Sequence, residues 1–205
     1  MAGAEAQVRG TVRRNAEAIA VLLHGASVGR GSTSWYAPAP LRMQPFVGPI
    51  ERASRRRIGV LRVRHPDRDW NTVFRGARDD TVRLLAKLER SYPGVPIALV
   101  GHSNGGRVAL RLSSDSRVHA IAALAPWIAP LDRITPPAGR PVLLMHGEKD
   151  DITSPRATAA LAATLRRRGC VVEHETVPGE NHALIARAGH WHRQVADFLV
   201  RHLLP

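Results

Sequence analysis

Short aliphatic runs alternate with longer amphipathic segments along most of this 205-residue chain. The runs are nearly all apolar, a pattern typical of parallel strands that are covered on both faces. Six such runs are candidate strands: Ile19–Leu23, Ile58–Val63, Pro96–Val100, His119–Leu124, Val142–Met145 and Val171–Val177. This alternation predicts a doubly wound α/β fold, with a mainly parallel sheet of about six to seven strands flanked by helices.

The segments between the runs have helical apolar spacing. The four longer ones are Thr72–Ser91, Asn104–Leu112, Pro155–Arg168 and His190–Leu203. The third has Ser154 as its N-cap, a proline at its first helical position and Gly169 just beyond its end, which are the expected start and stop signals.

Two stretches do not follow this alternation. Val28–Arg57 is rich in Gly, Pro and aromatic residues, with a short helix expected around Leu41–Ile50, and Ala125–Arg140 contains four prolines. Both follow the carboxyl ends of strands, the edge where ligands bind in an open α/β sheet. We therefore expect them to form the walls of a pocket.

The length suggests one domain over residues 1–205, whose first 17 residues form either an edge strand around Ala6–Arg13 or a flexible N-terminus. The apolar run Ala18–Leu23 is far shorter than the roughly 20 residues that cross a bilayer. Residues 1–14 lack the apolar segment of a secretory signal. We expect no membrane span and a cytoplasmic location.

The chain is strongly basic, with a formal net charge of +13. Such a charge raises nucleic acid as a partner. However, the densest runs, Arg55–Arg57 and Arg166–Arg168, are short and lack the interleaved aromatic residues that stack on unpaired bases. We therefore expect solvated arginines and no nucleic-acid partner.

The sequence Gly101-His102-Ser103-Asn104-Gly105 stands between a predicted strand and a predicted helix. A serine hydroxyl is a poor nucleophile unless a base removes its proton, and a sharp strand-to-helix turn lifts the side chain towards such a base. Ser103 is the predicted nucleophile. The alternative is that Ser103 only caps the helix.

A nucleophilic serine in this kind of sheet needs an acid and then a histidine further along the chain. Asp150 follows the predicted strand Val142–Met145 and is the predicted acid, with Asp151 and Glu148 as neighbouring alternatives. Another alternative is that Asp150 only stabilises its turn.

His182 follows the last predicted strand and is the predicted general base. His190 and His192 are its competitors, although both are expected in or near the final helix.

Two backbone amides are also required, because they bind the oxyanion of a tetrahedral intermediate. One is expected from Asn104, at the start of the helix after the serine. The other is expected from Ala26, in the loop after the first predicted buried strand, where His24 is expected to brace the backbone.

Through His24-Gly25, Gly101–Gly105, His146-Gly147-Glu148-Lys149-Asp150 and Gly179-Glu180-Asn181-His182, the sequence resembles the α/β-hydrolase superfamily. The likeness covers about Ala18–Leu204 and is nearest to the small dienelactone-hydrolase-like and esterase or thioesterase branches. It implies the roles of nucleophile, acid and base for Ser103, Asp150 and His182. Two features depart from many members: the first antiparallel strands are nearly absent, and the connection after Leu124 is too short for a helical lid.

The resemblance implies a serine hydrolase that cleaves a small-molecule carboxylic ester or thioester through an acyl-enzyme, without a cofactor. Trp127, Trp35 and Met43 are the predicted pocket residues. No zinc-like Cys/His spacing is present, so no metal is expected. A peptidase, a carbon–carbon bond hydrolase and a non-catalytic binding module on the same scaffold are the alternatives. The sequence predicts no oligomeric state.

Overall fold

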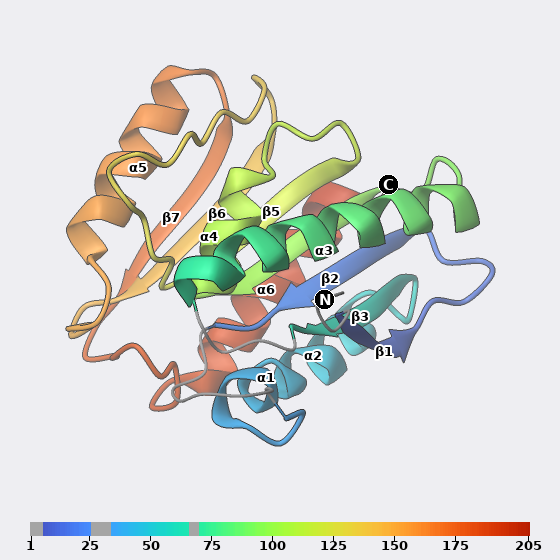
Figure 1. Ribbon diagram of the computed structural model, residues 1–205, viewed down its shortest axis with the longest axis horizontal. Helices are drawn as coiled ribbons and strands as arrows, with labels where there is room; N and C mark the ends of the chain where they lie inside the picture. The colour runs from blue at the N-terminus through green and yellow to red at the C-terminus, as the bar shows by residue number, and fades with distance from the viewer. Residues whose placement is uncertain (1–5, 26–33, 66–69) are drawn as a thin grey trace.

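The computed structural model describes residues 6–25, 34–65 and 70–205 (Figure 1). Its strands are β1 (Gln7–Thr11), β2 (Ala18–Leu23), β3 (Ile58–Arg64), β4 (Ile97–His102), β5 (Val118–Leu124), β6 (Pro141–Gly147) and β7 (Val171–Val177). Its helices are α1 (Pro38–Arg42), the 3-10 turn η1 (Gln44–Phe46), α2 (Val47–Ala53), α3 (Trp70–Ser91), α4 (Asn104–Arg111), α5 (Pro155–Arg167) and α6 (Ala188–Leu203).

The strands form one sheet in the order β1-β3-β2-β4-β5-β6-β7. β1 runs antiparallel to β3, and the other neighbouring strands are parallel. This arrangement confirms the predicted mainly parallel α/β sheet. The chain reverses its direction of winding between β2 and β4, and ligands bind at such a switch point in open α/β sheets.

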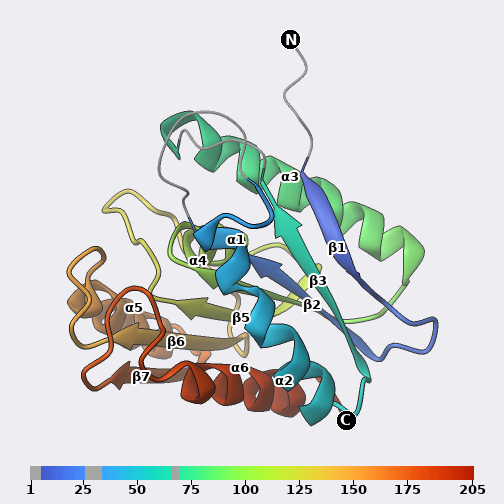
Figure 2. The same cartoon turned by 90° about the horizontal axis from the view of Figure 1, so that it is seen from below.

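Helices cover both faces of the sheet (Figures 1 and 2). In β2, Ala20 and Leu22 pack towards one core with side chains of α2 and α6, whereas Val21 and Leu23 pack towards another with side chains of α3, α4 and α5. Because successive side chains point to opposite faces, a strand buried on both sides must be apolar at every position. This burial explains the continuous apolar run in the sequence.

The strand β7 differs from the expectation of a fully buried run. It lies at the edge of the sheet, and its residues from Val171 to Thr176 are half-buried or exposed. Glu173 and Glu175 on β7 pair with side chains of α6, including Arg201 and His190. An edge strand has no neighbour on one side, so polar side chains can reach water there.

The predicted short helix around Leu41–Ile50 is part of a longer helical stretch, formed by α1, η1 and α2. Met43, Phe46 and Ile50 are buried against α6, so this segment is a covering layer of the sheet. The signals around α5 are confirmed: Ser154 accepts a hydrogen bond from the Ala157 amide, and Gly169 has a φ of 80°.

The connection between β5 and β6 contains no helix, so no large lid covers the sheet. Within the described residues, no helix combines the length and the apolar character that a membrane span requires.

Candidate active site

Ser103 lies at the turn from β4 into α4 and has a φ of 54° and a ψ of −118°. A non-glycine residue in this left-handed region is strained, by about 1 to 3 kcal/mol. Close packing around two glycines imposes the turn. A Cβ on Gly101 would lie 2.2 Å from the Gly105 carbonyl oxygen, and one on Gly105 would lie 2.3 Å from the Leu23 carbonyl oxygen.

The hydroxyl of Ser103 does not cap α4, which argues against the capping alternative. The backbone of Ser103 is instead held on both sides: its amide donates to Leu124, and its carbonyl accepts from Arg107 and Trp127. The side chain is therefore positioned by the backbone alone.

Asp150 follows β6, and its carboxylate is buried. The Oδ1 atom accepts hydrogen bonds from the amides of Ile152 and Thr153, at 2.9 Å each. The Oδ2 atom accepts from the Thr153 hydroxyl at 2.8 Å and lies 3.1 Å from His146 Nε2. Burial alone raises the pKa of Asp150, but hydrogen bonds from His146, His182 and Thr153 outweigh it and hold the pKa below its ordinary value.

His182 lies in the loop after β7, and its Nδ1 atom is 2.8 Å from Asp150 Oδ2. This bond fixes Nδ1 as the protonated nitrogen, so Nε2 is free to accept a proton. The competing histidines lie elsewhere: His190 pairs with Glu175, and His192 packs its ring 4.5 Å from Phe46.

The other two acidic candidates do not contact His182. Glu148 accepts a hydrogen bond from the Gly179 amide, and Asp151 is exposed. Among the acidic side chains that the structure describes, Asp150 alone hydrogen-bonds to His182.

A chain of contacts joins the serine turn to Asp150 and His182. The Ser103 amide bonds to Leu124, the next residue Ala125 lies 3.3 Å from the Thr153 hydroxyl, and Thr153 contacts both Asp150 and His182. In the part of the chain described, no hydrogen bond links the Ser103 hydroxyl to His182. Such bonds are often long in free enzymes and shorten when substrate binds.

Several supporting residues were not found by sequence reasoning. His102 Nε2 lies 2.9 Å from the His182 carbonyl and so holds the backbone of that residue. Burial first, and then the charges of His182 and Arg42, lower the pKa of His102 to about 3, so His102 is a neutral donor. His102 lies within the Gly101–Gly105 motif and His146 begins the His146–Asp150 motif, so their positions in the sequence could have indicated a supporting role. No sequence signal pointed to Thr153.

The side chain of Glu180, which is fully buried, holds the loop that carries His182. Its carboxylate accepts hydrogen bonds from the amides of Asn181 and Arg187 and from the indole of Trp191. A Cβ on Gly147 would lie 2.5 Å from the Glu180 carbonyl oxygen. This close approach explains why the His146–Asp150 motif has a glycine at position 147, where a side chain would not fit.

Of the two residues predicted to supply oxyanion amides, the structure describes only Asn104. Asn104 is the first residue of α4, as expected. Ala26 lies outside the described residues, but its neighbour Gly25 approaches the serine: a Cβ on Gly25 would lie 3.0 Å from Ser103 Cβ. His24 braces this loop, because Nδ1 bonds to the Gly25 carbonyl at 2.6 Å and Nε2 accepts from the His65 amide at 3.0 Å.

The three predicted pocket residues are widely separated. Trp127 is 45% exposed and donates its amide to the Ser103 carbonyl. Met43 is buried in the core, where it is a packing residue. Trp35 lies at the β1–β3 edge, with its indole bonded to Gln7, and Arg9 and Arg62 stack on its ring. We therefore retain only Trp127 as a candidate substrate contact.

Two cavities include residues next to the Asp150–His182 pair, although neither Asp150 nor His182 lines them. One, of about 270 Å³, is lined by Trp127, Ile128 and Ala129 on one side and Ile152 and Thr153 on the other. The second, of about 390 Å³, lies between the 38–46 segment and the 183–192 segment, which directly follows His182.

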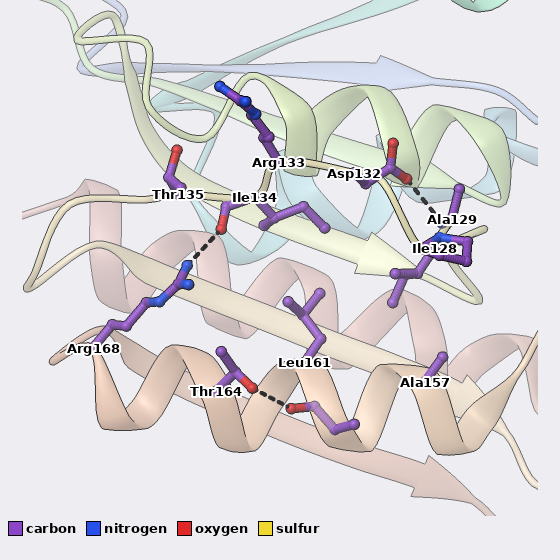
Figure 3. Close-up of a pocket in the computed structure, with 12 residues that line it drawn as sticks. Ile128, Ala129, Asp132, Arg133, Ile134, Thr135, Ala157, Leu161, Thr164 and Arg168 are labelled. Carbon is purple, nitrogen blue, oxygen red and sulfur yellow. Dashed lines mark hydrogen bonds between the residues drawn. The ribbon is translucent and has the colours of Figure 1, made fainter.

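A larger cavity of about 560 Å³ lies between α5 and the 128–135 segment (Figure 3). As in the two smaller cavities, none of Ser103, Asp150 and His182 lines it, and none of the described residues that line it hydrogen-bonds to Asp150 or His182. Its acidic residue, Asp132, forms ion pairs with Arg107 and Arg111, and accepts from the Ala129 amide. We interpret Asp132 as a brace for this segment.

Within residues 6–25, 34–65 and 70–205, no group of three or more His, Cys, Asp or Glu side chains is arranged to hold a metal ion.

Comparison with known families decides the identity of the fold. A family model described as the alpha/beta hydrolase family matches residues 20–141, more than half of the chain. The chain belongs to the alpha/beta hydrolase family. A second model, described as the prolyl oligopeptidase family, matches residues 121–205 of this hydrolase. No curated protein sequence matches the chain.

Solved structures agree with this assignment of the fold. This alpha/beta hydrolase resembles a lidless α/β serine hydrolase from Xanthomonas campestris at 22% identity, covering 98% of this chain and 89% of the other, with a TM-score of 0.70. It resembles esterase PE8 at 21% identity, with 97% and 99% coverage and a TM-score of 0.70. It also resembles a dienelactone hydrolase from Anabaena variabilis at 15% identity, with 97% and 92% coverage and a TM-score of 0.69.

Proposed function

We propose that this alpha/beta hydrolase cleaves carboxylic esters or thioesters through an acyl-enzyme on Ser103, with His182 as general base and Asp150 as the acid that orients it. The observation that carries the proposal is the 2.8 Å bond between His182 Nδ1 and Asp150 Oδ2. It lies in the same contact network as a strained serine turn.

In the first half of the reaction, His182 Nε2 takes the proton of the Ser103 hydroxyl while Oγ forms a bond to the substrate carbonyl carbon. The oxyanion that develops accepts hydrogen bonds from the Asn104 and Ala26 amides. When the intermediate collapses, the bond to the leaving group breaks, and that group takes the proton from His182.

In the second half, water attacks the acyl carbon of the Ser103 ester and gives its proton to His182. The second tetrahedral intermediate then collapses, Ser103 recovers its proton, and the carboxylic acid is released. Asp150 stays ionised throughout, because its hydrogen bonds lower its pKa. Its negative charge stabilises the imidazolium that forms twice in the cycle.

The short β5–β6 connection supports small or protruding substrates, because no lid is available to enclose a long acyl chain. The match to the prolyl oligopeptidase family makes a peptidase the second candidate. The same triad serves both reactions, so a screen of p-nitrophenyl esters, acyl-thioesters and aminoacyl-p-nitroanilides distinguishes them by the highest kcat/KM.

Labelling with a fluorophosphonate tests the nucleophile. We expect the wild-type protein to be labelled and Ser103→Ala to be unlabelled, with Ser113→Ala as the matched control that retains labelling. Equal labelling of wild type and Ser103→Ala would rule Ser103 out.

Substitution of the histidines tests the base. His182→Ala should lose about 10⁴-fold or more in kcat for an ester that the wild type cleaves, because triad members act as a unit. His190→Ala should retain turnover. The assignment fails if His182→Ala is active and His190→Ala is not.

A further inference from the structure

The cavity of about 390 Å³ beside His182 is mainly apolar. Its walls include Leu41, Pro45 and Phe46 on one side and Leu184 and Ile185 on the other. Ala183, the next residue after His182, also lines it, so the cavity begins where the proposed base is attached to the backbone. Figure 2 shows α1 on the same side of the sheet as α6.

One charged side chain, Arg42, lines this cavity among the residues that the structure describes. Arg42 is half-buried, and its side chain forms no hydrogen bond or ion pair with any described residue. Burial lowers the pKa of Arg42, although an arginine keeps its charge under all ordinary conditions. A half-buried guanidinium without an acidic partner among the described residues is available to pair with an anion.

One electrostatic observation connects Arg42 with the loop of the proposed base. The charge of Arg42 contributes to the lowered pKa of His102, whose ring donates to the His182 carbonyl, so Arg42 lies within electrostatic range of the loop of the base. The other titratable side chain in the cavity is His192, whose pKa burial also lowers. His192 is therefore neutral at pH 7 and does not compete for an anion.

We propose that Arg42 binds a carboxylate of the substrate, so that this hydrolase prefers esters in which an apolar chain ends in a carboxylate. The apolar walls hold the chain, and the guanidinium binds the carboxylate at its end through charge-assisted hydrogen bonds. The inference rests on the function proposed above and adds the class of substrate. Arg42 is a specificity-determining residue in this role.

Two matched pairs of esters test the proposal. On the acyl side, mono-p-nitrophenyl adipate is compared with p-nitrophenyl hexanoate. On the alcohol side, p-carboxyphenyl butanoate is compared with p-carbamoylphenyl butanoate. We expect the wild type to prefer the charged member of at least one pair by about tenfold or more in kcat/KM.

Substitution of Arg42 should remove this preference. Arg42→Gln should lower kcat/KM for the charged ester by about 10-fold to 100-fold and leave the neutral ester within about twofold. Arg42→Lys should recover part of the loss. The matched control is Arg52→Gln, an exposed arginine on α2 that does not line the cavity and should retain the preference. No preference in either pair, or an equal loss for both members, overturns the proposal.

A binding measurement separates this inference from the proposed function. Monomethyl adipate is titrated calorimetrically into Ser103→Ala and into the Ser103→Ala, Arg42→Gln double variant. About tenfold weaker binding to the double variant supports the anion site even if the wild type cleaves no ester and is not labelled. Equal binding to both variants rejects the anion site, even if ester hydrolysis on Ser103 is established.

Discussion

The Ser103 turn and the Asp150–His182 pair lie in one contact network, but different forces hold them. The turn is defined by backbone sterics, since Gly101 and Gly105 lack room for any side chain. The Ser103 hydroxyl makes no capping hydrogen bond to α4 that could hold the turn. The pair is defined by polar side chains, with Thr153 and His146 donating to the carboxylate of Asp150. The turn should therefore be sensitive to added volume, and the pair should be sensitive to lost donors or acceptors.

The largest expected effect is a loss of kcat on substitution within the Asp150–His182 pair. Asp150→Asn should lower kcat by about 10⁴-fold, because an amide can donate to His182 Nδ1 and leave the proton on the wrong nitrogen. Steady-state kinetics with a p-nitrophenyl ester measures the loss. Asp151→Asn, the exposed neighbour, is the control and should retain wild-type kcat. A kcat for Asp150→Asn within tenfold of the wild type contradicts the assignment of the acid.

The steric side is tested by adding one methyl group to the turn. Gly101→Ala should lower the free energy of unfolding by about 3 kcal/mol or more, because its Cβ would overlap the Gly105 backbone. Gly76→Ala is the control, since nothing lies within 4 Å of a Cβ there and the residue is in α3. That control should be neutral or stabilising by about 1 kcal/mol. Urea denaturation measures both, and a stable Gly101→Ala protein would refute the steric account.

Acid should destabilise the fold through the buried histidines that support the site. Burial, assisted by the neighbouring His65, lowers the pKa of His24 to about 3, and burial together with His182 lowers that of His102 to about 3. The unfolded chain binds protons at a pKa near 6.5 while the folded chain does not, so stability falls as the pH drops below about 6.5. Each histidine should cost about 2 kcal/mol between pH 7 and pH 5.

Denaturant titrations at pH 7 and pH 5 measure this effect. His102→Gln should reduce the difference between the two pH values by about 2 kcal/mol, because glutamine does not titrate. His119→Gln, at an exposed position, is the control and should leave the difference unchanged. An identical pH dependence for wild type and His102→Gln contradicts the prediction.

The smallest effect is expected at Thr153, whose hydroxyl is shared between Asp150 and His182. Thr153→Val keeps the shape and removes the donor, so kcat should fall by about tenfold with little change in KM. The control is Thr164→Val on α5, where the hydroxyl bonds only to local partners. A change in KM with constant kcat would mean that Thr153 contacts substrate and does not position the acid.

Much of the framework was predictable because its signals are local. The six predicted strands and the four long helices are present, with ends that differ by a few residues. Glycine spacing around Ser103 predicted a strand-to-helix turn, and the structure shows why each glycine is needed. The edge position of β7 was not predictable from its residues, since strand order depends on how the segments pack.

The pocket was the least predictable part. Met43 and Trp35 are apolar residues in one loop-like stretch, yet one packs in the core and the other at the sheet edge. Arg42 looks like any other of the many arginines in the sequence, and only its position against the 183–192 segment distinguishes it. Sequence separation hides such contacts, because the partners are more than a hundred residues apart.

The sequence by itself determined the kind of sheet, the turn that presents Ser103, and the order in which a serine, an aspartate and a histidine follow strands of that sheet. These features depend on residues adjacent in the chain, where apolar periodicity and missing side chains restrict the backbone. Tertiary structure alone decided which histidine meets Asp150, that Thr153 and His146 support that carboxylate, and that Arg42 faces the cavity next to His182. Those contacts arise only when distant segments pack together, because burial and hydrogen bonding are properties of the whole fold.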